Sequence, residues 1–158
     1  MRNLLIAASL SVLAAVPAAA AESQTKPVAA APAVASPPAG MGQVVFYRPS
    51  SMGALISCRV SSAGEVVNRL PPGKYFVQQL KPGVYDYSVK AEATDTLKVN
   101  VEDGETSFVR CAIGMGLMTG RPNLSTQSRE DFEKRGKKLK LQEPWVPKVG
   151  ENDDKPAG

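Results

Sequence analysis

Two cysteines are the side chains best suited to chemistry in this 158-residue chain, and no histidine accompanies them. Histidine is the commonest general acid or base near neutral pH and the commonest metal ligand. The carboxylates Asp95, Glu102, Asp103 and Glu105 lie at predicted turns, where acidic residues are common. The sequence therefore predicts a protein that is not an enzyme and that uses no metal or cofactor.

The two cysteines lie in alternating stretches typical of strands, Ile56–Val60 and Val109–Ile113. Alternation places Cys58 and Cys111 on the apolar faces of two different strands, where the side chains of a sandwich meet. Disulfides persist in the oxidising compartments that exported proteins enter. We therefore predict a buried disulfide between Cys58 and Cys111. Two inert buried thiols are the alternative, whereas a reactive thiol needs an exposed, electropositive setting.

The N-terminus has the pattern of a secretory signal peptide. Arg2 precedes the apolar stretch Leu4–Val16, and an alanine run follows Pro17. A charged start, a short apolar region and small residues in an A-x-A pattern predict a signal peptide over residues 1–21, cleaved after Ala20 or Ala21. The alternative is an uncleaved membrane anchor, which the proline and the short apolar length disfavour.

The expected location of the mature chain is the periplasm, or another exported compartment. The first cysteine is Cys58, far from the cleavage site, so the chain lacks the cysteine that a lipid anchor requires. No other long apolar run follows, so no transmembrane segment is expected after cleavage.

Composition divides the remaining chain into three parts. Residues 22–42 are rich in alanine and proline and predict a disordered tether, whose removal should change the melting temperature by only a few degrees. Residues 43–141 predict a single folded domain. Residues 142–158 are rich in proline, glycine and charge and are expected to be a disordered tail.

Short alternating segments separated by turn residues fill the predicted domain. Strands at this spacing predict an all-β, transthyretin-like (prealbumin-like) sandwich of seven to eight mostly antiparallel strands. Ser128 is expected to cap one short C-terminal helix that ends at Gly136. The expected strands are Gln43–Arg48, Ala54–Val60, Glu65–Leu70, Lys74–Leu80, Gly83–Ala91, Thr96–Val101, Glu105–Ile113 and, as a final edge strand, Lys138–Leu141.

Three stretches within 42–141 resemble a family of bacterial exported proteins known as domain of unknown function 2846 (DUF2846). They are Gly42–Pro49 (GQVVFYRP), Leu80–Tyr85 (LKPGVY) and Asp103–Arg110 (DGETSFVR). The resemblance implies an exported β-sandwich, and it supplies no activity and no catalytic residues.

A basic run near the C-terminus is a possible contact for an anionic partner. It places five cations within seven residues: Lys134, Arg135, Lys137, Lys138 and Lys140. Such a run can attract anionic envelope polymers or lipid headgroups. The alternative is a solvated face, partly offset by Glu130, Asp131 and Glu133.

Three further groups are weaker candidates for binding. Aromatic rings and an arginine fork bind hydroxyl-rich ligands, so Tyr47, Arg48, Tyr85 and Tyr87 are a candidate saccharide site. Core packing is the simpler role for Tyr85 and Tyr87. The segment Gly114–Gly120 is expected to be a connector, and its methionines and Leu117 are a candidate apolar partner surface. Trp145 lies in the predicted tail, where it docks either on the domain or on a partner.

We therefore expect a non-enzymatic envelope module that binds an unknown protein or polymer. A saccharide- or lipid-binding module is the alternative, and a hydrolase is disfavoured by the missing histidine and nucleophile motifs. The net charge of +4 is too small to indicate nucleic acid as a partner.

Overall fold

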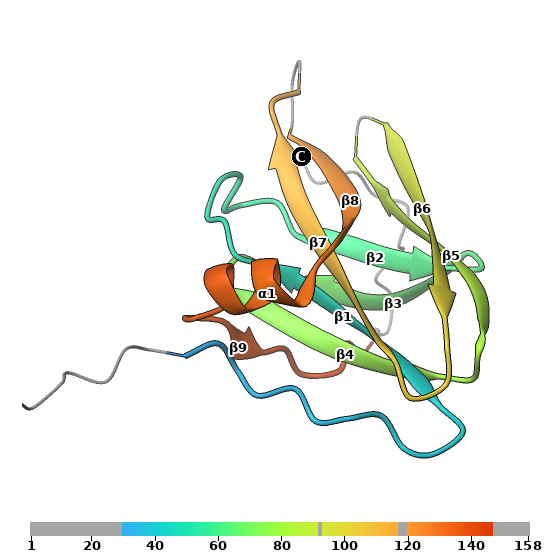
Figure 1. The fold of residues 1–158 in the computed structure, drawn as a ribbon. Helices are drawn as coiled ribbons and strands as arrows, with labels where there is room; N and C mark the ends of the chain where they lie inside the picture. The colour runs from blue at the N-terminus through green and yellow to red at the C-terminus, as the bar shows by residue number, and fades with distance from the viewer. Residues whose placement is uncertain (1–29, 92, 117–119, 147–158) are drawn as a thin grey trace, which may run out of the picture.

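A computed structural model of the chain describes residues 30–91, 93–116 and 120–146. The predicted signal peptide, the start of the predicted tether and most of the predicted tail lie outside these residues. Nine strands and one helix lie within them (Figure 1). The elements are β1 Gly42–Arg48, β2 Cys58–Ser62, β3 Glu65–Leu70, β4 Lys74–Leu80, β5 Gly83–Lys90, β6 Thr94–Val101, β7 Thr106–Gly114, β8 Arg121–Gln127, α1 Arg129–Arg135 and β9 Lys140–Leu141.

The strands form two sheets that pack face to face. One sheet has the order β8-β7-β1-β4-β9, and the other has the order β3-β2-β5-β6. Five of the seven strand pairs are antiparallel, while β1 pairs with β7 and β4 pairs with β9 in parallel. The predicted all-β sandwich of mostly antiparallel strands with one short C-terminal helix is confirmed.

The described residues form nine strands rather than the expected seven to eight, and two of these strands differ most from the sequence prediction. β8 (RPNLSTQ) was not predicted, because its proline and polar residues give it little intrinsic strand propensity. It forms by pairing along seven residues of β7, and it lies at the sheet edge, where proline is tolerated. β2 begins at Cys58 rather than at Ala54, because residues 49–57 form a loop whose carbonyls bond to a side chain instead of to a strand.

The core between the two sheets includes the residues that alternation placed on the inner faces of β2, β5, β6 and β7. Valines and leucines from both sheets surround the stacked rings of Phe46 and Phe76, whose centroids lie 4.8 Å apart, and Tyr87 meets Phe46 edge-on. The alternating residues Tyr87 and Val89 of β5 are both buried in this cluster. Side chains along a strand project to alternate faces, so alternation predicts the inner face of these four strands. It does not do so for β1, which is apolar on both faces, or for β8, which the sequence analysis did not predict.

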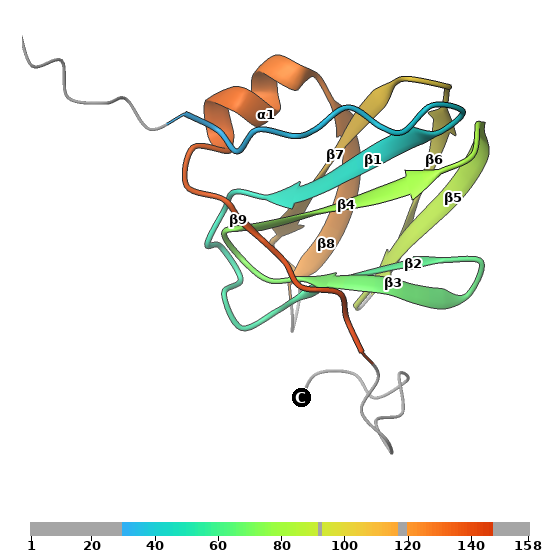
Figure 2. The same cartoon turned by 90° about the horizontal axis from the view of Figure 1, so that it is seen from below.

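A second apolar cluster covers the outer face of the five-stranded sheet. Val45, Tyr47 and Phe108 point outward from the sheet and meet Phe132 of α1 and Leu139. Residues 30–41, which we call the strap, run along this face beside α1 (Figure 2). Ala31 and Val34 of the strap pack on the cluster. Burial on both faces explains why all seven residues of β1 are inaccessible to solvent.

The strap therefore differs from the disordered tether expected over residues 22–42. The Gln43 side chain donates to the Ala35 carbonyl over 2.6 Å, and Gly104 N donates to the Met41 carbonyl over 3.0 Å. Alanine and proline bury little surface by themselves, which is why composition predicted a tether. They pack here because the sheet already presents an apolar outer face.

The helix α1 has the caps predicted from the sequence. The Ser128 hydroxyl accepts from Asp131 N over 3.3 Å, and Gly136 N donates to the Phe132 carbonyl over 2.6 Å. Acidic residues occupy the first turn and basic residues the last turn, which suits the helix dipole. Phe132 is the buried residue that docks the helix on the sheet.

The C-terminal segment closes one side of the sandwich. After β9 the Gln142 amide donates to the Tyr75 carbonyl, and Asn68 of β3 donates to the Glu143 carbonyl over 3.4 Å. Residues 142–146 thus contact both sheets, unlike the disordered tail predicted from residue 142 onward. On the opposite side, the Asp95 carboxylate of β6 accepts from Leu124 N of β8 over 2.7 Å. None of the helices in the described ranges is long and apolar enough to cross a bilayer.

Candidate functional site

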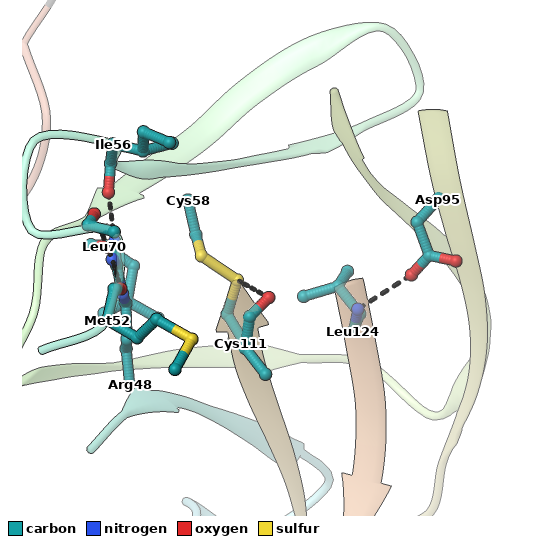
Figure 3. Close-up of a disulfide and its surroundings, with 10 residues drawn as sticks. Arg48, Met52, Ile56, Cys58, Leu70, Asp95, Cys111 and Leu124 are labelled. Atoms are coloured by element: carbon teal, nitrogen blue, oxygen red, sulfur yellow. Dashed lines mark hydrogen bonds between the residues drawn. A yellow bond between two sulfur atoms is a disulfide. The ribbon is translucent and has the colours of Figure 1, made fainter. Parts of the chain in front are cut away.

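The loop between β1 and β2 is organised around the guanidinium of Arg48. Arg48 ends β1, and its side chain is completely buried. Its Nη2 donates to the carbonyls of Met52 and Gly53 over 2.9 and 2.8 Å, and its Nη1 donates to the carbonyls of Ile56 and Leu70 (Figure 3). One side chain therefore fixes three carbonyls of the loop and one of β3.

The Arg48 guanidinium is unusual because its partners are all neutral. No carboxylate bonds to it among the residues described, and its Nε has no hydrogen-bond partner there. Burial lowers the pKa of Arg48, because desolvation disfavours the charged form. Arginine nevertheless stays charged in proteins, so the loop carbonyls are held by charge-assisted bonds. These bonds preorganise the loop.

The disulfide between Cys58 and Cys111 lies next to this loop (Figure 3). Cys58 begins β2 where the loop ends, and Cys111 lies in β7 of the other sheet. Their Cα atoms are 6.6 Å apart, and both residues are buried in the core between the sheets. The predicted pairing is confirmed. The bridge joins the two sheets where the loop enters β2.

Three apolar side chains project into solvent at this end of the sandwich. Leu55 is 100% exposed and Met52 is 60% exposed on the β1–β2 loop, and Met115 is 92% exposed just after β7. The loop packs on this end of β7, because a Cβ built on Gly53 would lie 2.8 Å from the side chain of Ile113. Gly53 also has a φ of +63°, so glycine suits this contact both sterically and conformationally. We call Met52, Leu55 and Met115 the apolar end.

The structure contradicts the candidate saccharide site. Tyr47 and Tyr87 are fully buried, as is Arg48, and they do not share one surface. Tyr87 donates to the Gln78 side chain over 2.9 Å within the inter-sheet core, and desolvation raises its pKa. Tyr85 packs against the same core and donates to the Lys81 carbonyl. Core packing, the simpler role expected for Tyr85 and Tyr87, is confirmed, and the saccharide site is wrong because strand aromatics fill both apolar layers.

Tyr47 instead joins the outer cluster to α1 through Asp131. The Tyr47 hydroxyl donates to Asp131 Oδ2 over 2.5 Å, Arg135 Nε donates to Oδ1 over 2.7 Å, and Arg110 Nη1 lies 3.5 Å from Oδ2. Burial raises the pKa of Asp131, but these hydrogen bonds and the two positive charges outweigh burial, so the net pKa is lowered. Burial and the bond to Asp131 raise the pKa of Tyr47. The cluster holds the helix on the sheet.

The five cations of the basic run all lie on the surface. Lys134, Lys137, Lys138 and Lys140 are exposed, and none of them forms an ion pair within the described ranges. Arg135 is also exposed but is paired with Asp131. Leu139 and Gly136, which lie between the cations in the sequence, are buried. The run thus presents four lysines to solvent.

A shallow groove lies beside this run, between the strap and α1. Its volume is about 460 Å³, and its lining combines Ala31 and Val34 with Phe132, Arg129 and Lys137. Residues 117–119 of the predicted connector lie outside the described residues. Trp145 lies against the domain, with the Arg69 guanidinium 5.2 Å from its ring centroid. Within the described ranges, no group of three or more acidic or cysteine side chains is arranged to hold a metal ion.

The fold and this end of the molecule define a class of protein: a small disulfide-linked β-sandwich with a loop that exposes apolar residues and whose carbonyls are bonded to a buried arginine. The model of the family described as protein of unknown function (DUF2846) matches residues 38–123. This match covers more than half of the chain, so the chain belongs to the DUF2846 family. It includes Arg48, the β1–β2 loop and both cysteines, and it ends before α1. No curated protein and no solved structure matches the chain.

Proposed function

We propose that the protein is a non-enzymatic module of the bacterial cell envelope that binds a protein partner through the apolar end. The observation that carries this proposal is a fully exposed leucine, Leu55, on a loop whose carbonyls are fixed by the buried Arg48. Exposed apolar side chains mark interaction surfaces when they gather at one place. Preorganisation lowers the entropy cost of binding, so a rigid apolar loop suits recognition.

Several features of the chain support the other parts of the proposal. The signal-peptide pattern of residues 1–21 and the Cys58–Cys111 bridge support export to an oxidising compartment. Both cysteines are used in the bridge and the chain has no histidine, which leaves few side chains for nucleophilic or acid–base catalysis. A binding role therefore fits the composition better than an enzymatic one.

The test is site-specific photo-cross-linking in intact envelopes, with the cross-linker at position 55. The matched control carries it at position 84, because Val84 is 62% exposed at the opposite end of the sandwich. We expect one discrete protein adduct from position 55 and none from position 84. The purified partner should then bind Leu55→Ser at least about tenfold more weakly than the unmodified protein.

Two results would contradict the proposal. Equal adducts from positions 55 and 84, or none from position 55, would show that the apolar end does not contact a protein. Binding to lipid vesicles that Leu55→Ser abolishes, without any protein adduct, would assign this end to a membrane surface instead.

A further inference from the structure

Within the described residues, the outer edge of β4 beyond Tyr75 is the part of the sandwich that lacks protection against pairing with another strand. β9 pairs only with Lys74 and Tyr75 at the start of β4 (Figure 2). Residues 76–80 have no strand beside them on that side within the described ranges. An uncovered edge presents backbone donors and acceptors that can template pairing with another chain.

The free backbone groups of this edge can be identified from the ladder. The Tyr75 carbonyl accepts from the Gln142 amide, so the backbone groups of Tyr75 face away from β1. Backbone groups alternate sides along a strand with a period of two. The N–H and C=O groups of Val77 and Gln79 therefore also face outward. Gln79 is exposed and Val77 is half-buried.

The other edge strands, β8, β6 and β3, each have a feature that hinders pairing with another strand. β8 contains Pro122, and its Leu124 amide is bonded to Asp95. β6 carries Asp95 and Lys98 and lies close to β8. On the remaining edge, β3 is next to a β-bulge in its pairing with β2, and Asn68 bonds to the C-terminal segment. Charges, prolines, bulges and covering segments are the usual protections of strand edges.

In the part of the chain that the structure describes, β4 has none of these protections beyond Tyr75. Its residues Phe76–Leu80 (FVQQL) contain no charge, proline or glycine, and their register with β1 is uninterrupted. The stretch is also self-complementary. A two-fold axis at Gln78 would place Val77 of one copy opposite Gln79 of the other, twice, with no like charges facing each other.

We propose that two copies of this chain pair through their β4 edges in antiparallel orientation, which joins the two five-stranded sheets into one continuous sheet. The outward groups of Val77 and Gln79 form the central hydrogen bonds.

The experiment measures sedimentation velocity of the purified protein over a wide range of concentration. The edge variants are Gln79→Lys, which adds a charge, and Gln79→Pro, which removes an outward donor at a position where an edge strand tolerates proline. Thr96→Lys is the matched control, because it adds the same charge to an exposed residue of β6. Thermal melts verify that each variant is folded.

We expect a monomer–dimer equilibrium for the unmodified protein and for Thr96→Lys. In both Gln79 variants the dimer dissociation constant should rise by about tenfold or more. Hydrogen exchange of the Val77 and Gln79 amides should slow at high concentration. Three results would overturn the proposal. They are a monomer at every concentration, a dimer that both edge variants still form, and amide exchange at Val77 and Gln79 that does not depend on concentration. Leu55→Ser should leave the dimer intact, so this result is independent of the proposed partner surface.

Discussion

The two faces of the five-stranded sheet are covered in different ways. The inner face packs on the other sheet, and its residues Val44, Phe46 and Val109 meet side chains that also come from strands. The outer face packs on the strap, on α1 and on the segment around Leu139. Strand alternation therefore predicts the partners of the inner face, whereas the outer face is covered by segments that carry little pattern of their own.

The strap shows that composition alone can place the start of a domain too late in the chain. An outer apolar face on β1, β4 and β7 must be covered, because exposed apolar surface of this size is costly in water. The alanine- and proline-rich strap covers part of it although its residues have no helical or strand periodicity. A segment without a secondary-structure pattern can thus be part of a domain because it covers apolar surface of the other elements.

Breaking the inner layer should have the largest effect on stability. The disulfide joins cysteines 53 residues apart, and the chain-entropy model gives about 4 kcal/mol for a loop of this length. Cys58→Ser should therefore lower the melting temperature strongly, and so should Cys111→Ser or an added reductant. Differential scanning calorimetry of each variant measures the loss.

The double serine variant is the control for this prediction. It should cost little more than either single variant, because both changes remove the same bond. A thiol count on denatured, unreduced protein should find no free thiol. Two free thiols, or a melting temperature that does not change when reductant is added, would show that the bridge does not stabilise the inner layer.

Removing the strap should have the second-largest effect. A chain that starts at Gly42 loses the packing of Ala31 and Val34 and the bond from Gln43 to the Ala35 carbonyl. We expect a loss of about 2 kcal/mol, since apolar burial contributes about 25 cal/mol per Å². Chemical denaturation of the shortened and longer chains measures the difference.

A pair of point changes separates packing from chain length. Val34→Asp should lower stability because Val34 packs on the outer cluster, whereas Ala33→Asp should not, because Ala33 is exposed. Equal stability of all these variants would mean that the strap is the loose tether that its composition suggests.

The bond between the outer face and α1 should contribute less. Asp131→Asn keeps the shape of the side chain but removes the charge that Arg110 and Arg135 contact. The change should cost about 1 kcal/mol near neutral pH, because the ion pairs are partly exposed. Urea unfolding curves at several pH values measure it.

The pH dependence has a definite sign. The pKa of Asp131 is lowered in the folded state, so its stabilising contribution is present above the unfolded pKa of about 3.9 and is lost as the pH falls through the folded value. The difference between the unmodified protein and Asp131→Asn should therefore shrink in acid. A difference that is constant from neutral pH to the acid limit would exclude an electrostatic role for Asp131.

Changing the exposed lysines should have the smallest effect on stability. The triple change of Lys137, Lys138 and Lys140 to glutamine should alter the free energy of unfolding by less than about 0.5 kcal/mol, because these side chains lie on the surface. If the run binds anionic vesicles or polymer, the triple variant and added salt should both weaken that binding, since exposed charges are screened over about 8–10 Å. Binding that is insensitive to both would leave the run a solvated face.

The Arg-Pro end of β1 shows where site prediction from sequence fails. An arginine after an apolar strand was interpreted as a ligand-binding fork, but Arg48 uses that fork on the carbonyls of its own loop. The carbonyls come from residues 52, 53, 56 and 70, and their convergence depends on how the loop folds back over the strand. A charged residue directly before a proline, at the end of a mostly apolar strand, is the available signal.

The sequence by itself determined most strands of the inner layer, the partners of the disulfide and both ends of α1. These features depend on local periodicity and on capping residues, which act within a few residues of chain. Only the tertiary structure decided that β8 would pair with β7, that the strap would cover the outer face, and that Arg48 would hold the loop rather than a ligand. Each of these depends on a surface or a set of carbonyls that exists only after distant segments have packed together. The local preferences of residues cannot predict such a contact, because its partner atoms come together only when the chain folds.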